Sequence, residues 1–342
     1  MKKRLLSLAK AVLFIALFCL LYTYSRDVLR DKVQSEALAI SARKPNGSYD
    51  VILAGPSHIE YAMQPAQLYG EYGIVSCNTA TPAQSIPTTY YVIKEMIARH
   101  KPKLVVLDLF CLFCKDNYFA PSRLHQALDN FPLSANKAEA VFDLTDKSRA
   151  EFFINYLLYH SRWKTLTEAD YTALSSYNET YRLAAGTWPY PEPYAPVPSS
   201  EKADIPAIPL RYLQKIVDLC QEKEVGLLLT VVPYRADIDN NDVSAVLQQE
   251  MFNMAEEYAE AWGVPYINGL HHLKEIGFDF TKDMIEYSHV NASGAEKVTA
   301  WYGAYMKEHF DLPDRRCEKK YAAWDEDYEE YLQALTEAKA AG

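Results

Sequence analysis

The chain has 342 residues, of which 49% are hydrophobic and 23% charged, so it can bury a substantial core and its composition does not indicate disorder. Its formal net charge of -10 argues against nucleic acid as a partner, because phosphate binding requires a basic surface. Length alone allows one large α/β domain with insertions or two small domains.

The first 25 residues predict a transmembrane anchor. An almost wholly apolar run at residues 5–24 follows Lys2, Lys3 and Arg4, and its length is about what a bilayer requires. No small-residue cleavage site follows the run directly, which favours a retained anchor over a cleaved signal peptide. The positive charge before the run predicts a single-pass protein of the cell membrane, with the remaining domain outside the cytoplasm.

After the anchor, residues 26–47 predict a polar helical stalk that the turn signal Pro45-Asn46-Gly47 ends. The folded domain is expected at residues 48–312. Its first half alternates short apolar runs with helical spacing: the expected strands are residues 50–54, 73–78 and 103–110, and the expected helices are residues 59–69 and 88–100.

The alternation resumes late in the chain. Helices are expected at residues 210–223 and 243–262, and strands at residues 226–232 and 264–267. Continuous apolar runs are typical of strands covered on both faces, so the alternation predicts an α/β protein with a doubly wound parallel sheet.

Two segments interrupt or follow this pattern. Residues 115–209 are expected to form a helical insertion over the edge of the sheet, with a Pro/Tyr-rich passage at residues 188–198 that is either a spacer or an aromatic lid. Residues 313–342 form a charged tail, which we expect to be a solvated terminal helix.

The cysteines and paired histidines do not indicate a metal site. Cys111 and Cys114 have the spacing of half a zinc site, but no second pair or close histidine completes the set, so we interpret them as small apolar residues, with a local disulfide as the alternative. His271 and His272 have no carboxylate or cysteine at ligand spacing. We therefore assign no metal and no cofactor.

Ser57 is the first candidate catalytic residue. Open α/β sheets bind ligands at the carboxyl ends of their strands, and Ser57 follows the expected strand at residues 50–54 after the turn residues Gly55 and Pro56. A serine on such a turn is accessible to a carbonyl carbon, and the following helix points backbone N–H groups at the same place. The alternative is a plain helix N-cap.

His289 is the candidate base, because it lies in a polar loop after the last expected strand and hence on the same rim as Ser57. A catalytic histidine needs an acceptor that holds its tautomer. Glu286 and Asp283, both in this loop, are the two candidates for that acid.

Two sequence blocks carry a family resemblance. Residues 52–60 (ILAGPSHIE) and 288–297 (SHVNASGAEK) resemble the first and last blocks of SGNH/GDSL hydrolases, and in particular the membrane-anchored bacterial members related to the DltD and alginate-acetylation proteins. The resemblance implies the flavodoxin-like fold of that family, with Ser57 as nucleophile and His289 as base. The acid usually lies three residues before the histidine, which is Glu286 in place of the commoner aspartate, and this departure leaves Asp283 open.

The middle blocks of the family match less well. The family completes its oxyanion hole with a glycine and an asparagine, and this chain offers residues 78–84 and the strand end at residues 108–110. Asn78 or Gln84 is the candidate side-chain donor, with turn residues as the alternative. His58 is a further polar residue beside the serine, either a substrate contact or a helix N-terminal residue.

These residues predict a serine-dependent O-acyltransferase or esterase. An anchored domain outside the membrane meets envelope polymers at high effective concentration, so exopolysaccharide, teichoic acid or peptidoglycan is the expected substrate. The resemblance implies a membrane-bound O-acyltransferase as partner. The alternative is a non-catalytic glycan-binding or scaffold protein with the same fold. A redox function for Cys111 and Cys114 is disfavoured, because such a pair belongs at a helix start after the first strand.

Overall fold

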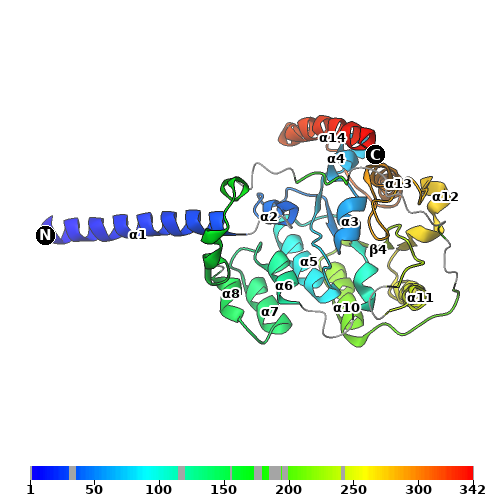
Figure 1. Cartoon of the computed structure of the whole chain (residues 1–342), viewed down its shortest axis with the longest axis horizontal. Coiled ribbons are helices and arrows are strands. Elements are labelled where there is room, and N and C mark those ends of the chain that lie inside the picture. The colour runs from blue at the N-terminus through cyan, green and yellow to red at the C-terminus, as the bar shows by residue number, and fades with distance from the viewer. Residues whose placement is uncertain are drawn as a thin grey trace.

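One long helix projects from the α/β body of the protein (Figure 1). The structure is a computed structural model and describes residues 2–30, 36–114, 120–154, 156–172, 179–184, 194, 199–239 and 243–341. The projecting helix, α1 (Lys2–Leu29), is by length and composition able to cross a membrane, and its apolar window is 0% buried, which excludes a core helix. The same properties fit a signal sequence, while topology and orientation stay predictions.

A five-stranded parallel sheet lies at the centre of the body. Its strands are β1 (Val51–Ala54), β2 (Ser76–Asn78), β3 (Leu104–Asp108), β4 (Gly226–Val231) and β5 (Tyr266–Asn268). Their order is β2-β1-β3-β4-β5, with every neighbouring pair parallel. The chain adds β2 on one side of β1 and β3 on the other, so the topological switch point lies at the carboxyl end of β1.

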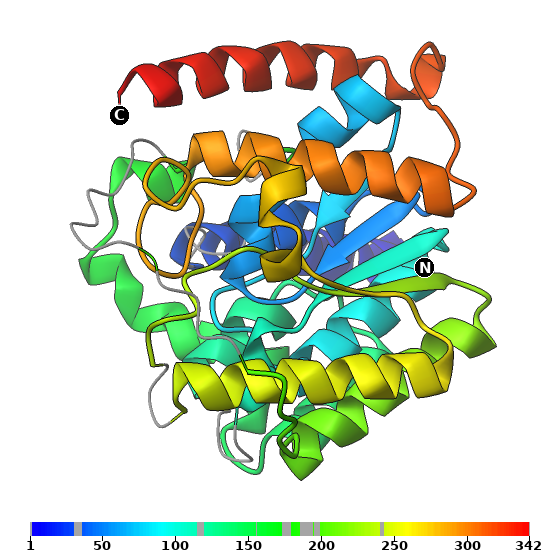
Figure 2. The ribbon, with the colours of Figure 1, turned by 90° about the vertical axis from the view of Figure 1, so that its right-hand side faces the viewer.

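Helices cover both faces of the sheet, as Figure 2 shows. Alternate residues of one strand point to opposite faces, and accordingly Ile52 packs in a core cluster with helices α5 and α10, whereas Leu53 packs in a second cluster with α3 and α13. The predicted doubly wound sheet is confirmed, and the apolar runs are explained by burial on both sides.

The helices have the following bounds, with η marking short 3-10 helices: α2 Glu36–Ser41, α3 Ser57–Ala62, α4 Pro65–Tyr72, α5 Ile86–His100, η1 Phe110–Phe113, α6 Pro121–Leu128, α7 Ala135–Leu144, α8 Arg149–Phe153, α9 Tyr156–Tyr159, η2 His160–Lys164, η3 Glu168–Tyr171, α10 Ala207–Glu222, α11 Ala245–Trp262, η5 Gly269–His271, α12 Leu273–Ile276, α13 Ala292–His309, η6 Lys319–Tyr321 and α14 Ala323–Ala340.

The single helix predicted at residues 59–69 is two helices in the structure. Helix α3 ends at Ala62 and α4 begins at Pro65. Proline disfavours the helical conformation of the residue before it, and Gln64 is accordingly extended, with φ -104° and ψ 109°. The break limits α3 to six residues.

The predicted polar stalk at residues 26–47 differs from the structure. Helix α1 continues to Leu29, and α2 packs on the body beside β2, with Leu38 and Ala39 fully buried. Leu38 belongs to the main core cluster, so removing the residues before Gly47 would remove part of that core.

The terminal helix α14 is also more than a solvated tail. One of its faces packs on α4 and α13 through Tyr331 and Leu335, which are 1% and 5% exposed. These two residues lie four apart and therefore on one side of the helix. Because acidic residues surround Tyr331 and Leu335 in the sequence, an interpretation based on charge alone does not detect this apolar face.

The insertion at residues 115–209 supplies helices α6 to α9 near the end of α1 (Figure 1). The proposed spacer or lid at residues 188–198 lies outside the described residues except for Tyr194, whose ring centroid is 3.9 Å from that of Phe280. Before this passage, Thr180 and Ala184 accept backbone hydrogen bonds from Ala66 and Ala292, so residues 180–184 run across the helices beside the sheet.

Cys111 and Cys114 lie in and just after η1 as free, buried thiols. A hydrogen bond with Cys114, together with burial, raises the pKa of the Cys111 thiol. Such a thiol resists conversion to the reactive thiolate, in keeping with a packing role.

Candidate active site

The turn between β1 and α3 presents Ser57 at the switch point of the sheet. Gly55 has φ +139°, a conformation that L side chains rarely adopt, and a Cβ added there would lie 3.0 Å from the Cβ of Asp108. Glycine therefore lets the chain pass close to the end of β3. After Pro56 the helix begins at Ser57, whose side chain is partly exposed.

Ser57, His289 and Glu286 form one hydrogen-bonded chain. Ser57 Oγ lies 2.7 Å from His289 Nε2, and His289 Nδ1 is hydrogen-bonded to Glu286 Oε1. An ionised carboxylate can only accept hydrogen bonds, so Nδ1 carries the proton and Nε2 is the acceptor for the Ser57 hydroxyl. This is the arrangement that a general base requires.

The surroundings of Glu286 favour its ionised form. Burial raises the pKa of this carboxyl, but hydrogen bonds from His289 and Ser288 outweigh that effect, and the net pKa lies below its ordinary value. Ser288 Oγ donates to Glu286 Oε1 at 2.5 Å and lies 3.0 Å from His289 Nδ1. Glu286 therefore stays negatively charged next to the imidazole ring of His289.

The loop that carries His289 is held by its own backbone and by Asn291. Met284 and Val290 form an antiparallel bridge, and Ile285 N donates to His289 O at 2.9 Å. Asn291 caps α13 by accepting from the backbone of its first turn, and its Nδ2 donates to Lys282 O and Met284 O. His289 is thus presented from an ordered hairpin-like loop.

Asp283, the other predicted acid, has a different partner. Its carboxylate is fully buried and accepts hydrogen bonds from Lys297 Nζ at 2.7 and 2.9 Å, and from Asp279 N at 2.7 Å. Asp283 therefore ties the loop to α13, and the structure brings Glu286, not Asp283, to His289.

Aromatic rings hold His289 on two sides. The His58 ring is stacked at a centroid distance of 5.1 Å, and the Tyr61 ring meets His289 edge-on at 5.1 Å. His58 itself stacks on Phe110 at 3.4 Å. The packing restricts rotation of the imidazole that must face Ser57.

His58 is 5% exposed, and neither ring nitrogen has a hydrogen-bond partner among the described residues. Burial, with a further contribution from His289, lowers the pKa of His58 well below its ordinary value. The ring is therefore neutral, and one N–H next to Ser57 has its hydrogen-bonding capacity unused.

The predicted oxyanion donors Asn78 and Gln84 are occupied within the fold. Asn78 Nδ2 donates to Ile59 O and Met63 O at 3.1 and 3.3 Å, which ties β2 to the end of α3. Gln84 Nε2 donates to Thr79 O at 3.1 Å and to Thr81 Oγ1 at 3.0 Å. Neither amide N–H is available to an oxyanion in this conformation. Helix α3 begins at Ser57, and its first-turn N–H groups lack partners inside the helix.

Asp108 lies at the strand end that was noted for the middle blocks, but it was not among the predicted site residues. It ends β3, is 0% exposed, and its carboxylate accepts from Phe110 N and Val232 N at 3.0 and 2.9 Å. Burial raises its pKa to about 7, although these two hydrogen bonds act in the opposite direction. Asp108 joins the ends of β3 and β4 directly beside Gly55.

Two arginines near the site were also missed. Arg182, from the insertion, donates to Glu60 Oε1 at 2.6 Å, and its guanidinium lies over the Tyr61 ring. Arg235, after β4, donates its backbone N–H to Tyr287 O at 2.9 Å. No local pattern links these residues to Ser57, because each reaches the site from a distant part of the chain.

No protein-family model and no curated protein matches the sequence. Among solved structures, the chain is similar to a GDSL-like lipase from Bacteroides thetaiotaomicron, with 12% identity, a TM-score of 0.37, and coverage of 75% of this chain and 87% of the lipase. The geometry at Ser57 therefore carries the functional argument.

Proposed function

We propose that the chain is a serine-dependent esterase or O-acyltransferase in which Ser57 is the nucleophile, His289 the base and Glu286 the acid. The observation that supports this most directly is the continuous hydrogen-bonded chain from Ser57 Oγ through His289 to Glu286. These residues lie 232 and 3 positions apart in sequence. If Ser57 served only as a helix N-cap, it would not require a histidine within hydrogen-bond distance.

In the proposed reaction, Ser57 Oγ attacks the carbonyl carbon of an ester while His289 Nε2 takes its proton. The imidazolium then gives that proton to the leaving alcohol, and an acyl ester forms on Ser57. Water or a sugar hydroxyl attacks this ester with His289 again as base, and Ser57 is regenerated. Glu286 stays ionised and stabilises the imidazolium.

The proposed substrate is an acylated cell-envelope polysaccharide, such as exopolysaccharide, teichoic acid or peptidoglycan. If α1 is retained as a membrane anchor, the site faces envelope polymers at high effective concentration. A membrane-bound O-acyltransferase is the proposed partner, since it would supply the acyl group to the anchored domain.

The non-catalytic alternative, a glycan-binding or scaffold protein, does not require Ser57 and His289 to be in contact. The direct hydrogen bond between them, with the histidine tautomer set by Glu286, favours the enzyme.

The test is labelling by a fluorophosphonate probe, which reacts with activated serines. The full chain in detergent is used, because α2 belongs to the core. We expect the probe on Ser57 in wild type, and its loss in Ser57→Ala and His289→Ala. Ser122→Ala, which removes an exposed serine of α6, is the matched control and should label like wild type. Labelling that persists in Ser57→Ala would refute the proposed nucleophile.

Turnover distinguishes hydrolysis from transfer. Wild type is given an acetylated model ester with and without a deacetylated polysaccharide, and free acetate and polymer-bound acetate are both measured. Acetate on the polymer indicates a transferase, and free acetate alone indicates an esterase. Glycan binding without labelling or turnover would favour the scaffold function.

A further inference from the structure

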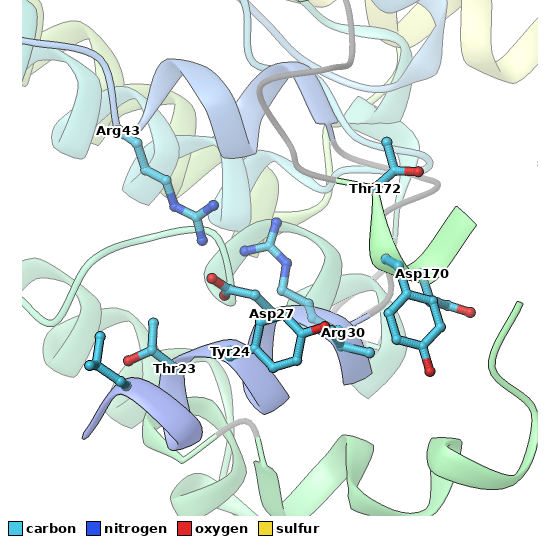
Figure 3. A pocket seen from close by; sticks show the side chains of 10 residues that line it. Thr23, Tyr24, Asp27, Arg30, Arg43, Asp170 and Thr172 are labelled. Carbon is cyan, nitrogen blue, oxygen red and sulfur yellow. The ribbon is translucent and has the colours of Figure 1, made fainter. Parts of the chain in front are cut away.

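A pocket of about 410 Å³ lies where α1 meets the body, and none of its lining residues belongs to the candidate site at Ser57 (Figure 3). Three separate segments build it: the last turns of α1, the residue Arg43 after α2, and the end of η3. The lining residues used below are Leu20, Tyr24, Asp27, Arg30 and Arg43.

Arg30 is the unusual residue of this pocket. Arg30 is only 4% exposed. Its guanidinium forms no hydrogen bond or ion pair with any described residue. Figure 3 shows the Arg30 and Arg43 guanidinium groups directed toward one another. Burial, followed by the charge of Arg43, lowers the pKa of Arg30 to about 10. Two cations are therefore held close together, and among the described residues Asp27 is the one carboxylate whose charge raises the pKa of both, although burial outweighs it at each.

The carboxylates that act on Arg30 are already engaged. Asp129 and Asp27 raise its pKa by their charge, but less than burial and Arg43 lower it. Their hydrogen-bond partners are His125 and Tyr159 for Asp129, and Arg26 for Asp27. Within the part of the chain that the structure describes, neither Arg30 nor Arg43 is paired with a carboxylate. The pocket is thus suited to an external anion.

The position of the pocket along α1 indicates the source of that anion. The apolar run ends at Tyr24, six residues before Arg30, which corresponds to about 9 Å along a helix. The polar headgroup layer on each side of a bilayer is about 5–8 Å thick. If α1 spans a membrane, Arg30 and Arg43 lie at the outer boundary of the headgroups.

The side of the pocket that α1 forms is apolar and leads to the exposed apolar face of that helix. Leu17, Leu20 and Leu21 of α1 are 51%, 67% and 68% exposed. Leu20 and Tyr24 line the pocket itself, so a continuous apolar surface leads from the exposed face of α1 to the two guanidinium groups. Acyl chains fit along this surface, and a phosphate attached to them reaches the cations.

We propose that this pocket binds the phosphodiester of an anionic membrane phospholipid through Arg30 and Arg43, with the acyl chains lying along α1. Guanidinium groups bind phosphate oxygens by paired, charge-assisted hydrogen bonds. A bound phosphodiester places one negative charge between the two guanidinium groups and so lowers their mutual repulsion, which a zwitterionic headgroup does less well because it also carries a cation. The site fixes the body against the membrane, and it is independent of the chemistry at Ser57.

The experiment measures binding to the full, delipidated chain in a neutral maltoside detergent. The probes are dioctanoyl phosphatidylglycerol, dioctanoyl phosphatidylcholine and inorganic phosphate, and the readouts are the lipid retained in native mass spectrometry and the shift in Tm. We expect phosphatidylglycerol to be retained and to raise Tm saturably, with phosphatidylcholine and inorganic phosphate at least tenfold weaker.

Variants assign the binding to the two arginines. Arg30→Gln and Arg43→Gln should each weaken phosphatidylglycerol binding at least tenfold, whereas Arg211→Gln, the same charge change at an exposed position of α10, should not. Arg43 is exposed, so its variant keeps the test valid if Arg30→Gln fails to fold. Ser57→Ala should bind like wild type, which separates this result from the proposed catalysis.

Three results would overturn the proposal. Unchanged phosphatidylglycerol binding in Arg43→Gln would place the lipid elsewhere. An equal response to inorganic phosphate would indicate a site for a free anion, and an equal response to phosphatidylcholine would remove the role of net charge.

Discussion

Replacing Glu286 with glutamine tests the proposed triad at the member that was hardest to identify. Glutamine keeps the shape of the side chain and an acceptor oxygen for His289 Nδ1, but it removes the negative charge. That charge stabilises the imidazolium that forms when His289 takes the proton of Ser57. The substitution therefore affects the transition state more than the ground state.

The expected magnitude follows from the exposure of the pair. In serine hydrolases with a buried triad, changing the acid to its amide lowers kcat by about 10⁴. The side chain of Glu286 is 30% exposed, so water can screen part of the lost interaction. We expect a decrease in kcat of about 10²–10³, which corresponds to about 3–4 kcal/mol of transition-state stabilisation.

The assay is hydrolysis of p-nitrophenyl acetate, with the concentration of folded protein taken from thermal unfolding. Asp283→Asn is the matched control, because it makes the same kind of change in the same loop at a carboxylate that pairs with Lys297. Breaking a buried ion pair costs about 3–5 kcal/mol of stability, less here because Lys297 is partly exposed. We expect Asp283→Asn to lower Tm, with kcat of the folded protein within about tenfold of wild type.

The opposite pattern would refute the assignment. If Asp283→Asn abolished turnover in protein that is still folded while Glu286→Gln retained it, the acid would be Asp283. If both variants kept full activity, the hydrogen bond between Glu286 and His289 would have no catalytic role.

Three further predictions concern the scaffold around the site. Gly55→Ala should destabilise the protein by about 1–3 kcal/mol and slow probe labelling of Ser57, because the added Cβ meets Asp108 at 3.0 Å in a strained conformation; labelling at the wild-type rate would contradict this. Burial raises the pKa of Asp108 to about 7, above its unfolded value of about 4, so its contribution to stability falls as pH rises between these values. Urea unfolding of wild type and Asp108→Asn should therefore show wild type losing up to about 4 kcal/mol relative to the variant between pH 4 and pH 8, and a constant difference would refute the buried ionisation. Tyr331→Ala should cost about 3 kcal/mol and increase amide exchange in α14, since Tyr331 is 1% exposed and donates to Gln67 Oε1, whereas Leu332→Ala on the exposed side should have little effect.

Local pattern was sufficient for the framework of this protein. Strands buried on both faces must be continuously apolar, and amphipathic helices must repeat every 3.6 residues, so the alternation along the chain predicted the doubly wound sheet. Ser57 and His289 could be proposed as a pair from the sequence because each follows a strand or precedes a helix at the rim where such sheets bind ligands, and the structure places them in hydrogen-bond contact.

Tertiary packing decided the remaining features. Glu286 and Asp283 lie in one loop, and only the position of Lys297 on α13 shows that Asp283 is already paired. Asn78 was a candidate oxyanion donor from the sequence, but in the structure its amide donates to a carbonyl of α3. Leu38 and Tyr331 lie in segments that the sequence predicted to be polar and solvated, but both side chains are buried against the body.

The physical reason is the range of the interactions. Hydrophobic period and turn chemistry act between neighbours a few residues apart, so the amino-acid order determines them directly. Which carboxylate meets which cation, and which amide is left to bind a ligand, depends on contacts between separate elements. Asp283 meets Lys297 of α13, 14 residues away, and Asn78 meets Ile59 of α3, 19 residues away, and only the folded chain brings these together.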